Sequence, residues 1–435
     1  MKIAVAGTGY VGLVTGVCLA DKGHSVTCVD VDAAKIEQMR AGRSPIYEPG
    51  LEELMRKNAA RLAFTTDHEA AYADAEVIFI GVGTPEKKDG SANLKYVYDV
   101  ARQIAASVKR ECVVVVKSTV PIGTNDKVEK FLHEHTSGVR VHVASNPEFL
   151  AQGTAVRDTL TPSRIVLGVE DAFSEKVLRA VYADFDAPML AMNRRSAEMV
   201  KYASNDFLAL KISYINEIAN LCESVGADIE DVTAGMGFDS RIGNKFLQAG
   251  IGYGGSCFPK DTKALSWLAN FNDTEIKTVR AAIEVNENQK LKLLKKAKKY
   301  FPEGFSGLKV ALLGLTFKPG TDDLREAPSL VNVAILLEDG AQVFAWDPVG
   351  VPNYKRLYPE EITYCDTIEQ TLAGADVCFI FTEWEDVKAL PPKTFKQLMN
   401  TPIVVDGRNC FALPACEEAG ITYLSVGRRA VEPTA

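Results

Sequence analysis

The chain has 435 residues, of which 47% are hydrophobic and 24% charged, values close to those of ordinary soluble globular proteins. This composition excludes a disordered, collagen-like or disulfide-scaffold chain, and the length predicts two or three domains. Acidic residues outnumber basic ones 57 to 49, so the net charge of -8 argues against a generic nucleic-acid or anionic-membrane surface. We therefore expect a few local cations to hold any anionic ligand.

The nine cysteines are scattered, without a Cys-x-x-Cys pair of the kind that binds zinc or exchanges disulfides. This usage fits a reducing compartment, and we expect the cytoplasm. The five histidines lie outside the motifs described below, and His133 and His135 are two residues apart, so on a helix they would not share a face as a metal pair does. We expect no metal.

The first part of the chain alternates short apolar segments with helix-length segments. Strands are predicted at Lys2–Val5, Ser25–Val29, Val77–Val82, Cys112–Ser118 and Val141–Ala144, with a helix at Val11–Asp21. Strands separated in this way form parallel βαβ units, so the sequence predicts an α/β fold with a doubly wound sheet.

The turn after the first strand reads Gly7-Thr8-Gly9-Tyr10-Val11-Gly12, the dinucleotide-binding fingerprint. Its glycines also argue against interpreting the uncharged run Ile3–Ala20 as a signal or membrane segment. Asp30 ends the second strand, where a carboxylate accepts hydrogen bonds from the ribose hydroxyls of NAD and repels the extra phosphate of NADP. Asp32 adds negative charge, so NAD is the predicted cofactor. The alternative is a glycine turn that binds nothing.

The centre of the chain changes pattern. A long helix is predicted over Ser196–Ser224, with Met199, Tyr202, Leu208, Ile212 and Ile215 at helical spacing, and we expect it to form a spine between domains and an oligomer interface. The lysine-rich segment Lys290–Lys299 is interpreted as a solvated helix face rather than a basic patch. We predict an NAD-binding Rossmann-like domain at 1–195, a helical domain at 196–300 and a second Rossmann-like domain at 301–435.

Strands in the last part are predicted at Leu308–Leu313, Gly340–Trp346, Asp376–Thr382 and Ile403–Asp406. The turn Gly314–Gly320 lacks the fingerprint spacing, while Lys318 and Arg325 are suited to contacting phosphates. We expect this half to bind a different nucleotide or a nucleotide-like substrate. The alternative is a structural duplicate that has lost its ligand.

The most informative segment is Gly250–Asp261, with four glycines in six residues followed by Ser256, Cys257 and Pro259. Pro259 suits the first turn of a helix, which places Cys257 at the helix N-terminus. There the helix dipole and Lys260 favour the thiolate, and Asp261 follows four residues later. This combination predicts a cysteine nucleophile, whereas an isolated cysteine is usually buried filler.

Two further motifs carry polar side chains suited to catalysis. Lys201 and Asn205 lie one turn apart on the long helix and suit an alkoxide or a polarised water, or else they are a surface pair. Glu148 follows a strand, where open α/β sheets place ligand groups, and is a candidate acid or base or a strand-end turn residue. NAD together with a nucleophilic cysteine indicates oxidation beyond the alcohol level, because an aldehyde gives up hydride only after a nucleophile adds to it.

Several motifs together resemble those of the UDP-glucose 6-dehydrogenase family of nucleotide-sugar 6-dehydrogenases over nearly the whole chain. They are Gly7–Gly12, Ser118–Thr124, Asn146–Leu150, Arg241–Asn244, Gly254–Cys257, Phe317-Lys318 with Arg325, and Asp406–Arg408. The resemblance implies a four-electron oxidation of UDP-glucose to UDP-glucuronate with two NAD. It implies Cys257 as the nucleophile, with Lys201, Asn205 and Asp261 acting on the oxyanion and a water, and Glu148 and Thr119 assisting.

The resemblance also implies two sets of binding residues. For NAD they are Gly7, Gly9, Tyr10, Val11, Gly12, Asp30, Lys35, Thr84, Thr119, Lys260 and Arg325. For the UDP-sugar they are Glu148, Phe149, Leu150, Lys201, Asn205, Ile212, Arg241, Phe246, Tyr253, Gly254, Phe258, Phe317, Lys318 and Arg408. The residue that matches Arg241 reaches in from a neighbouring subunit in the family, so a homodimer or higher homo-oligomer is expected, without nucleic acid or membrane partners. One departure is Gln152, where many members carry glutamate.

Other interpretations stay open. The sugar nucleotide is alternatively GDP-mannose or a UDP-N-acetylhexosamine, because contacts to the base and to C2 decide this choice. A one-step hydroxyacid dehydrogenase would yield one NADH and need no cysteine. A non-catalytic NAD-dependent regulator would be indifferent to Cys257→Ser.

Overall fold

The computed structural model describes residues 1–136 and 138–433 and divides into two compact units. Unit 1 comprises residues 1–204 and 267–273, and unit 2 comprises residues 205–266 and the chain from Thr274 onward. The chain changes unit at three points: within the 32-residue α9 (Arg194–Val225), within α11 (Phe258–Phe271), and in the turn that follows α11. The long central helix is present as predicted, while the three-domain division at 195 and 300 stays a prediction.

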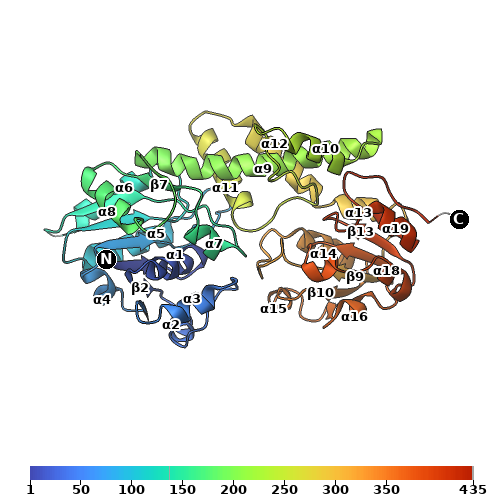
Figure 1. Ribbon diagram of the computed structural model, residues 1–435, viewed down its shortest axis with the longest axis horizontal. Coiled ribbons are helices and arrows are strands. Elements are labelled where there is room, and N and C mark those ends of the chain that lie inside the picture. Colours follow the sequence, from blue (N-terminus) through green and yellow to red (C-terminus); the bar gives the residue numbers. More distant parts are fainter. Residues whose placement is uncertain (137, 434–435) are drawn as a thin grey trace. The chain divides into compact units, whose positions relative to one another are not determined.

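Unit 1 is built on an eight-stranded sheet with the order β3-β2-β1-β4-β5-β6-β7-β8 (Figure 1). Neighbouring strands are parallel except β6 and β7. The strands are β1 (Lys2–Ala6), β2 (Ser25–Val29), β3 (Leu62–Thr65), β4 (Val77–Ile80), β5 (Cys112–Val116), β6 (Val141–Ser145), β7 (Ile165–Gly168) and β8 (Met189–Met192). The helices are α1 (Tyr10–Asp21), α2 (Ala33–Arg40), α3 (Leu51–Lys57), α4 (His68–Ala73), α5 (Lys95–Ser107), α6 (Thr124–His135), α7 (Ala155–Leu160) and α8 (Ala172–Val181).

The central strands of this sheet are buried on both faces. Along β4, Ile78 and Ile80 belong to one hydrophobic cluster, whereas Val77 and Phe79 belong to another. This alternation is the two-residue period of a strand whose faces are both covered. The apolar run 3–20 is divided between β1 and α1, and no helix within residues 1–136 and 138–433 has both the length and the apolar character needed to cross a bilayer.

Unit 2 contains a six-stranded parallel sheet with the order β11-β10-β9-β12-β13-β14. This order corresponds to β3-β2-β1-β4-β5-β6 of unit 1, which is the doubly wound dinucleotide-fold order. The strands are β9 (Lys309–Leu313), β10 (Gln342–Trp346), β11 (Ile362–Tyr364), β12 (Val377–Ile380), β13 (Ile403–Asp406) and β14 (Thr422–Leu424). The remaining helices are α10 (Ile229–Gly237), α12 (Lys277–Gln289), α13 (Lys292–Ala297), α14 (Pro328–Glu338), α15 (Val351–Tyr354), α16 (Ile368–Leu372), α17 (Glu385–Lys388), α18 (Lys393–Leu398) and α19 (Leu413–Ala419). The predicted fold class is confirmed.

Some strands end earlier than predicted. The segments beginning at Val77 and Cys112 leave the sheet after Ile80 and Val116, respectively. The residues that follow form loops, and these two loops are joined by a hydrogen bond from the Ser118 hydroxyl to the carbonyl of Val82 at 2.6 Å. Carboxyl ends of parallel strands are where ligand-binding loops of this fold lie.

The interpretation of Lys290–Lys299 as a solvated helix face is wrong for part of the segment. Lys290 is buried and pairs with Glu287 and Glu326, at 2.9 and 2.8 Å. Lys296 lies 2.8 Å from Glu223. Glu287 is one helical turn before Lys290, but Glu326 and Glu223 are distant in sequence, so the lysine run itself gives no sign of the pairs with them.

Candidate active site

The fingerprint turn has the close packing that its glycines predicted. Gly7 has φ +94°, and a Cβ on Gly12 would lie 2.0 Å from the Gly7 carbonyl oxygen. A Cβ on Gly9 would meet nothing within 4 Å, so the start of α1 is open where a pyrophosphate approaches the helix amides. The turn therefore fits a dinucleotide.

Asp30 is positioned by the same turn. Its Oδ2 accepts hydrogen bonds from Thr8 N at 2.9 Å and Thr8 Oγ1 at 2.6 Å, and its Oδ1 accepts from Asp32 N at 3.0 Å. Burial alone would raise the pKa of Asp30, but these hydrogen bonds and nearby Lys35 hold it below its usual range. Asp30 is thus a fixed carboxylate, whereas the Asp32 side chain caps α2 by accepting from Ala34 N and Lys35 N.

A cavity of about 540 Å³ lies beside Asp30. It is lined by Gly7 and Asp30 together with residues of α4 and α5 that the sequence did not single out, among them Tyr72, Tyr96 and Arg102. These side chains come from helices distant in sequence, and periodicity alone marks them only as ordinary helix residues. An aromatic and cationic wall suits the adenosine part of a dinucleotide.

Two predicted residues meet at the next strand ends. The Thr84 hydroxyl donates to the carbonyl of Thr119 at 2.8 Å. The loop that carries Thr119 is held at its far end by Glu198 of α9, which accepts from Gly123 N at 2.5 Å and Asn125 N at 2.9 Å. Helix α9 therefore fixes the loop of unit 1 that carries Thr119.

Glu148 and Lys201 form a buried ion pair. Lys201 Nζ lies 2.9 Å from Glu148 Oε1, and the side chains are 3% and 5% exposed. Glu148 Oε2 accepts from Leu150 N at 2.8 Å. Lys201 and Arg164 both lie over the ring of Phe149, at 5.6 and 3.8 Å from its centroid. The structure thus brings together Glu148, Phe149, Leu150 and Lys201, and adds Arg164, which the sequence did not indicate.

Cys257 immediately precedes α11, as predicted, and Pro259 lies in the first turn. The Cys257 carbonyl accepts from Asp261 N at 2.8 Å, so the cysteine lies at the positive end of the helix dipole. Asp261 is buried, accepts from Asn205 Nδ2 at 2.7 Å, and pairs with Lys260. Lys260 is therefore engaged with a carboxylate rather than being a bare cation near the thiol.

The other cysteines lie in different surroundings. Burial raises the pKa of six of them, those at 18, 28, 112, 378, 410 and 416. For Cys28 and Cys112 the pKa rises to about 12, which keeps the thiol protonated and unreactive. Cys257 is half-buried, as are Cys365 and Cys410, and it directly precedes α11.

The glycines before Cys257 pack against protein. A Cβ on Gly254 would lie 2.4 Å from the Glu326 carbonyl oxygen, and one on Gly255 would lie 2.7 Å from the ring of Phe317. Gly255 N also donates to the carbonyl of Arg325 at 2.7 Å. The sequence had indicated close approach to a ligand, but the structure shows close approach to the 317–326 loop, which places Phe317 beside the cysteine loop.

Three predicted substrate residues form an aromatic cluster. The ring of Phe258 meets those of Phe246 and Tyr253 edge to face, at 6.2 and 5.7 Å between centroids. Phe246 has φ +64°, a strained backbone for a bulky residue, and such strain concentrates at functional sites. Ile212 is half-buried on α9, and Lys318 Nζ lies 5.6 Å from the Phe317 ring centroid.

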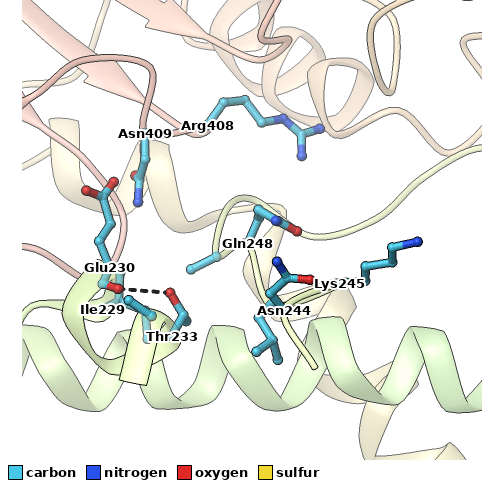
Figure 2. A pocket seen from close by; sticks show the side chains of 11 residues that line it. Ile229, Glu230, Thr233, Asn244, Lys245, Gln248, Arg408 and Asn409 are labelled. Atoms are coloured by element: carbon cyan, nitrogen blue, oxygen red, sulfur yellow. Dashed lines mark hydrogen bonds between the residues drawn. The ribbon is translucent and has the colours of Figure 1, made fainter. Parts of the chain in front are cut away.

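Arg408 is fixed by backbone carbonyls. Its Nε donates to Phe381 O at 2.8 Å and its Nη2 to Phe317 O at 2.9 Å. It lines a cavity of about 580 Å³ together with Glu230, Lys245, Gln248 and Asn409, whose side chains are drawn in Figure 2. Apart from Arg408, these lining residues were missed, because Glu230 lies in the short helix α10 and the other three in irregular segments, none of them within a recognised motif.

Two predicted residues are engaged within unit 2. Arg241 is 87% exposed and pairs with Asp239 at 2.6 Å. Arg325, predicted to contact NAD, pairs with Asp323 at 2.6 Å and, like Lys260, belongs to unit 2, whereas the fingerprint belongs to unit 1.

The second Rossmann-like sheet differs from the first at the residue equivalent to Asp30. Asp347 follows β10 and is buried. Its Oδ2 accepts from the amide of Leu315 at 2.7 Å and from Trp384 Nε1 at 3.1 Å, and its Oδ1 accepts from the amide of Gly350 at 2.6 Å. Asp30 is half-buried and accepts from three protein donors, whereas Asp347 is buried and accepts in addition from the Trp384 indole, so its carboxylate is less open to a ribose than that of Asp30.

Comparisons with known proteins agree with this geometry. The UDP-glucose/GDP-mannose dehydrogenase family models match here as an NAD binding domain at residues 1–186, a central domain at 195–288 and a UDP binding domain at 311–413. The chain is 52% identical to the UDP-glucose 6-dehydrogenase YwqF of Bacillus subtilis over 100% of this chain and 99% of that protein.

Two solved structures are similar. A UDP-glucose dehydrogenase of Pyrobaculum islandicum has a TM-score of 0.91 at 40% identity, covering 97% of this chain and 96% of the other. A UDP-D-ManNAc dehydrogenase of Pyrococcus horikoshii has a TM-score of 0.87 at 27% identity, covering 98% and 99%. The protein is an NAD-dependent dehydrogenase, and the chain belongs to the UDP-glucose/GDP-mannose dehydrogenase family.

Proposed function

We propose that the protein oxidises the C6 hydroxymethyl group of UDP-glucose to a carboxylate, giving UDP-glucuronate and two NADH per turnover. The observation that carries this proposal is Cys257 at the N-terminus of α11, directly before the buried Asp261–Asn205 contact. A one-step dehydrogenase needs no such cysteine. The similarity to UDP-glucose 6-dehydrogenases over the full length supports the choice of substrate.

The chemistry needs a covalent stage at the aldehyde level. NAD supplies the hydride acceptor for both oxidations. The Cys257 thiolate forms a C–S bond to the aldehyde carbon, and the carbonyl electron pair moves onto oxygen to give the alkoxide form of a thiohemiacetal. Loss of hydride from that carbon restores the C=O bond as a thioester. Water then adds to the thioester, the C–S bond breaks, and the carboxylate and the thiolate separate.

The polar residues receive roles that match their chemistry. Lys201 and Asn205 stabilise the oxyanion, and Asp261 keeps the Asn205 amide oriented through the 2.7 Å hydrogen bond. Glu148 and Thr119 assist the proton transfers of thioester formation and hydrolysis. Such roles require groups that are held rigidly, and the burial of Glu148, Lys201 and Asp261 supports them.

Binding residues are proposed for the cofactor and for the substrate. The Gly7–Gly12 turn, Asp30, Lys35, Thr84, Thr119, Lys260 and Arg325 are proposed to contact NAD. The UDP-sugar is proposed to contact the substrate residues named in the sequence analysis, with Lys318 and Arg408 as the cations for its diphosphate. Nine free cysteines support a reducing compartment such as the cytoplasm.

A homodimer is proposed on the exposed face of α9. Phe207, Tyr214, Leu221 and Val225 are 61%, 49%, 57% and 67% exposed and recur at intervals of seven, seven and four residues, so they form one apolar stripe. A stripe of this kind on a long helix suits a second copy of the same helix.

The test compares Cys257→Ser with wild type, using NADH yield per UDP-glucuronate formed and calorimetric binding of UDP-glucose. We expect two NADH per product in wild type. In Cys257→Ser we expect retained binding and acid formation reduced by about 1,000-fold or more. Cys365→Ser, at another half-buried cysteine, is the matched control and keeps full activity.

Other outcomes separate the alternatives. Unchanged turnover in Cys257→Ser refutes the covalent mechanism, and one NADH per product indicates a one-step dehydrogenase. A panel containing UDP-glucose, GDP-mannose and UDP-N-acetylhexosamines decides the sugar, and a higher kcat/KM for any of the latter overturns the proposed substrate.

A further inference from the structure

Lys117 is a buried lysine that the roles above leave unexplained. It directly follows β5, two residues before Thr119, and is 8% exposed. Its Nζ donates to Asn146 Oδ1 at 2.9 Å and to the Asn146 carbonyl at 3.4 Å. Within residues 1–136 and 138–433, no carboxylate lies within ion-pair distance of this ammonium. Burying an ammonium on neutral acceptors alone is costly, so such a position calls for a function.

The acceptor of Lys117 anchors the turn that carries Glu148. Asn146 Oδ1 also accepts from Tyr182 OH at 2.5 Å, and Asn146 Nδ2 donates to Val166 O at 2.8 Å. Asn146 N donates to Val116 O at 3.0 Å. Every polar group on the Asn146 side chain is therefore used, and the start of the turn is rigid.

Glu148, two residues after Asn146, forms the ion pair with Lys201. Glu148 lies 2.9 Å from Lys201 and also accepts from Leu150 N. The buried charges of this region are thus two ammonium groups, Lys117 and Lys201, and one carboxylate. Lys201 contacts Glu148 directly. Lys117 acts on Glu148 through the attraction between their charges and through its hydrogen bond to Asn146.

We propose that Lys117 is a positioning residue of the reaction: it holds the Asn146–Glu148 turn and adds a buried positive charge that helps to keep the Glu148 side chain facing Lys201. This inference rests on the proposed roles of Glu148 and Lys201. Lys117 itself touches neither substrate nor cofactor in this assignment.

The electrostatics agree with this assignment. Burial lowers the pKa of Lys117 to about 8, with Glu148 acting to raise it and Lys201 to lower it further. Of the remaining neighbours, Cys18 of α1 raises the Lys117 pKa, and Tyr182, after α8, contributes a phenol that burial keeps neutral. The positive charge on Lys117 is therefore lost at mildly alkaline pH, which gives the proposal a readout that a purely structural lysine lacks.

The experiment measures kcat and KM from pH 6 to 10 for wild type, Lys117→Met and Lys117→Gln in the full-length enzyme. Wild-type kcat is expected to fall above about pH 8 as Lys117 loses its proton. Both variants are expected to lose about 100-fold in kcat at pH 7, to lack this alkaline inflection, and to keep KM for NAD near the wild-type value. Lys117→Gln keeps a donor for Asn146 without the charge.

Tyr182→Phe is the matched control, because it removes the other donor to Asn146 Oδ1 and no charge. It is expected to keep the alkaline inflection and most of kcat. The proposal is overturned if Lys117→Met retains the wild-type profile, or if Tyr182→Phe reproduces the loss caused by Lys117→Met. If neither lysine variant folds, a wild-type profile without an inflection near pH 8 overturns it, and one with the inflection supports it. Two NADH per product in wild type, measured separately, shows that the proposed function stands whichever result is found for Lys117.

Discussion

Asn205 donates a hydrogen bond from Nδ2 to Oδ2 of Asp261 at 2.7 Å, and both side chains are buried. The other oxygen of Asp261 pairs with Lys260. Asp261 thus fixes which way the Asn205 amide points, and the loop of Cys257 ends at the helix that carries Asp261. Orientation of a neutral donor by a buried carboxylate is a way to prepare a site for developing negative charge.

Asn205→Ala tests this relationship. We expect kcat to fall by about 100-fold and the free energy of unfolding to fall by about 1–3 kcal/mol, because a buried acceptor loses its donor. Asn220→Ala is the control on the same helix, since Asn220 donates to Gln289 at 3.0 Å. It should lower stability and leave kcat unchanged. If Asn205→Ala and Asn220→Ala lost kcat equally, the role of Asn205 would be structural only.

Asp30→Ala tests the choice of cofactor. Removing the carboxylate removes the acceptor for ribose hydroxyls and the charge that repels a 2′-phosphate, so the ratio of kcat/KM for NAD over NADP should fall by about 100-fold. Asp32→Ala is the comparison, because the Asp32 side chain caps α2. That variant should cost about 1 kcal/mol of stability and keep the NAD preference. A changed preference in Asp32→Ala would contradict this division of roles.

Asp206 makes stability depend on pH. It is 4% exposed, neither carboxyl oxygen has a hydrogen-bond partner among the described residues, and burial together with the charge of Asp261 raises its pKa to about 8. The folded state keeps this proton up to about pH 8, whereas an unfolded aspartate loses it near pH 4, so this group lowers stability as pH rises between those values.

Asp206→Asn should therefore raise the melting temperature by several degrees at pH 8 and have little effect at pH 4. Calorimetry at a series of pH values measures this difference. Glu217→Gln, at an exposed carboxylate of the same helix, is expected to show no such trend. A pH-independent effect of Asp206→Asn would place the ionisation elsewhere.

The apolar stripe of α9 predicts the assembly. Replacing Phe207 and Leu221 by glutamate together should convert a dimer into a monomer, because two charges per copy would be buried in the interface. Light scattering coupled to size exclusion gives the mass directly. Phe271→Glu, at an exposed aromatic residue outside the stripe, should leave the mass unchanged. A monomeric wild type would rule out the interface.

Short sequence motifs predicted those parts of the site that are formed by residues adjacent in sequence. The fingerprint turn, Asp30 at the end of β2 and Cys257 before α11 each follow from a few neighbouring residues with defined conformational preferences. Lys117 lies 29 residues from Asn146 in sequence, and Glu48 caps the 153–155 segment by accepting from Ala155 N at 2.7 Å across 107 residues. Contacts of this range are set by the packing of the sheet, and a single sequence carries no periodic sign of them.

The occupied carboxylate of Asp347 has a consequence for redesign. Its two oxygens are saturated by the main chain of the neighbouring turns and by the Trp384 indole. A coenzyme fingerprint grafted onto the loop after β9 would therefore face a carboxylate that is more buried than Asp30 and already accepts a hydrogen bond from the Trp384 indole. A redesign would first have to remove hydrogen-bond donors from Asp347, starting with Trp384→Phe. That change would make the loop that carries Phe317 and Lys318 less rigid.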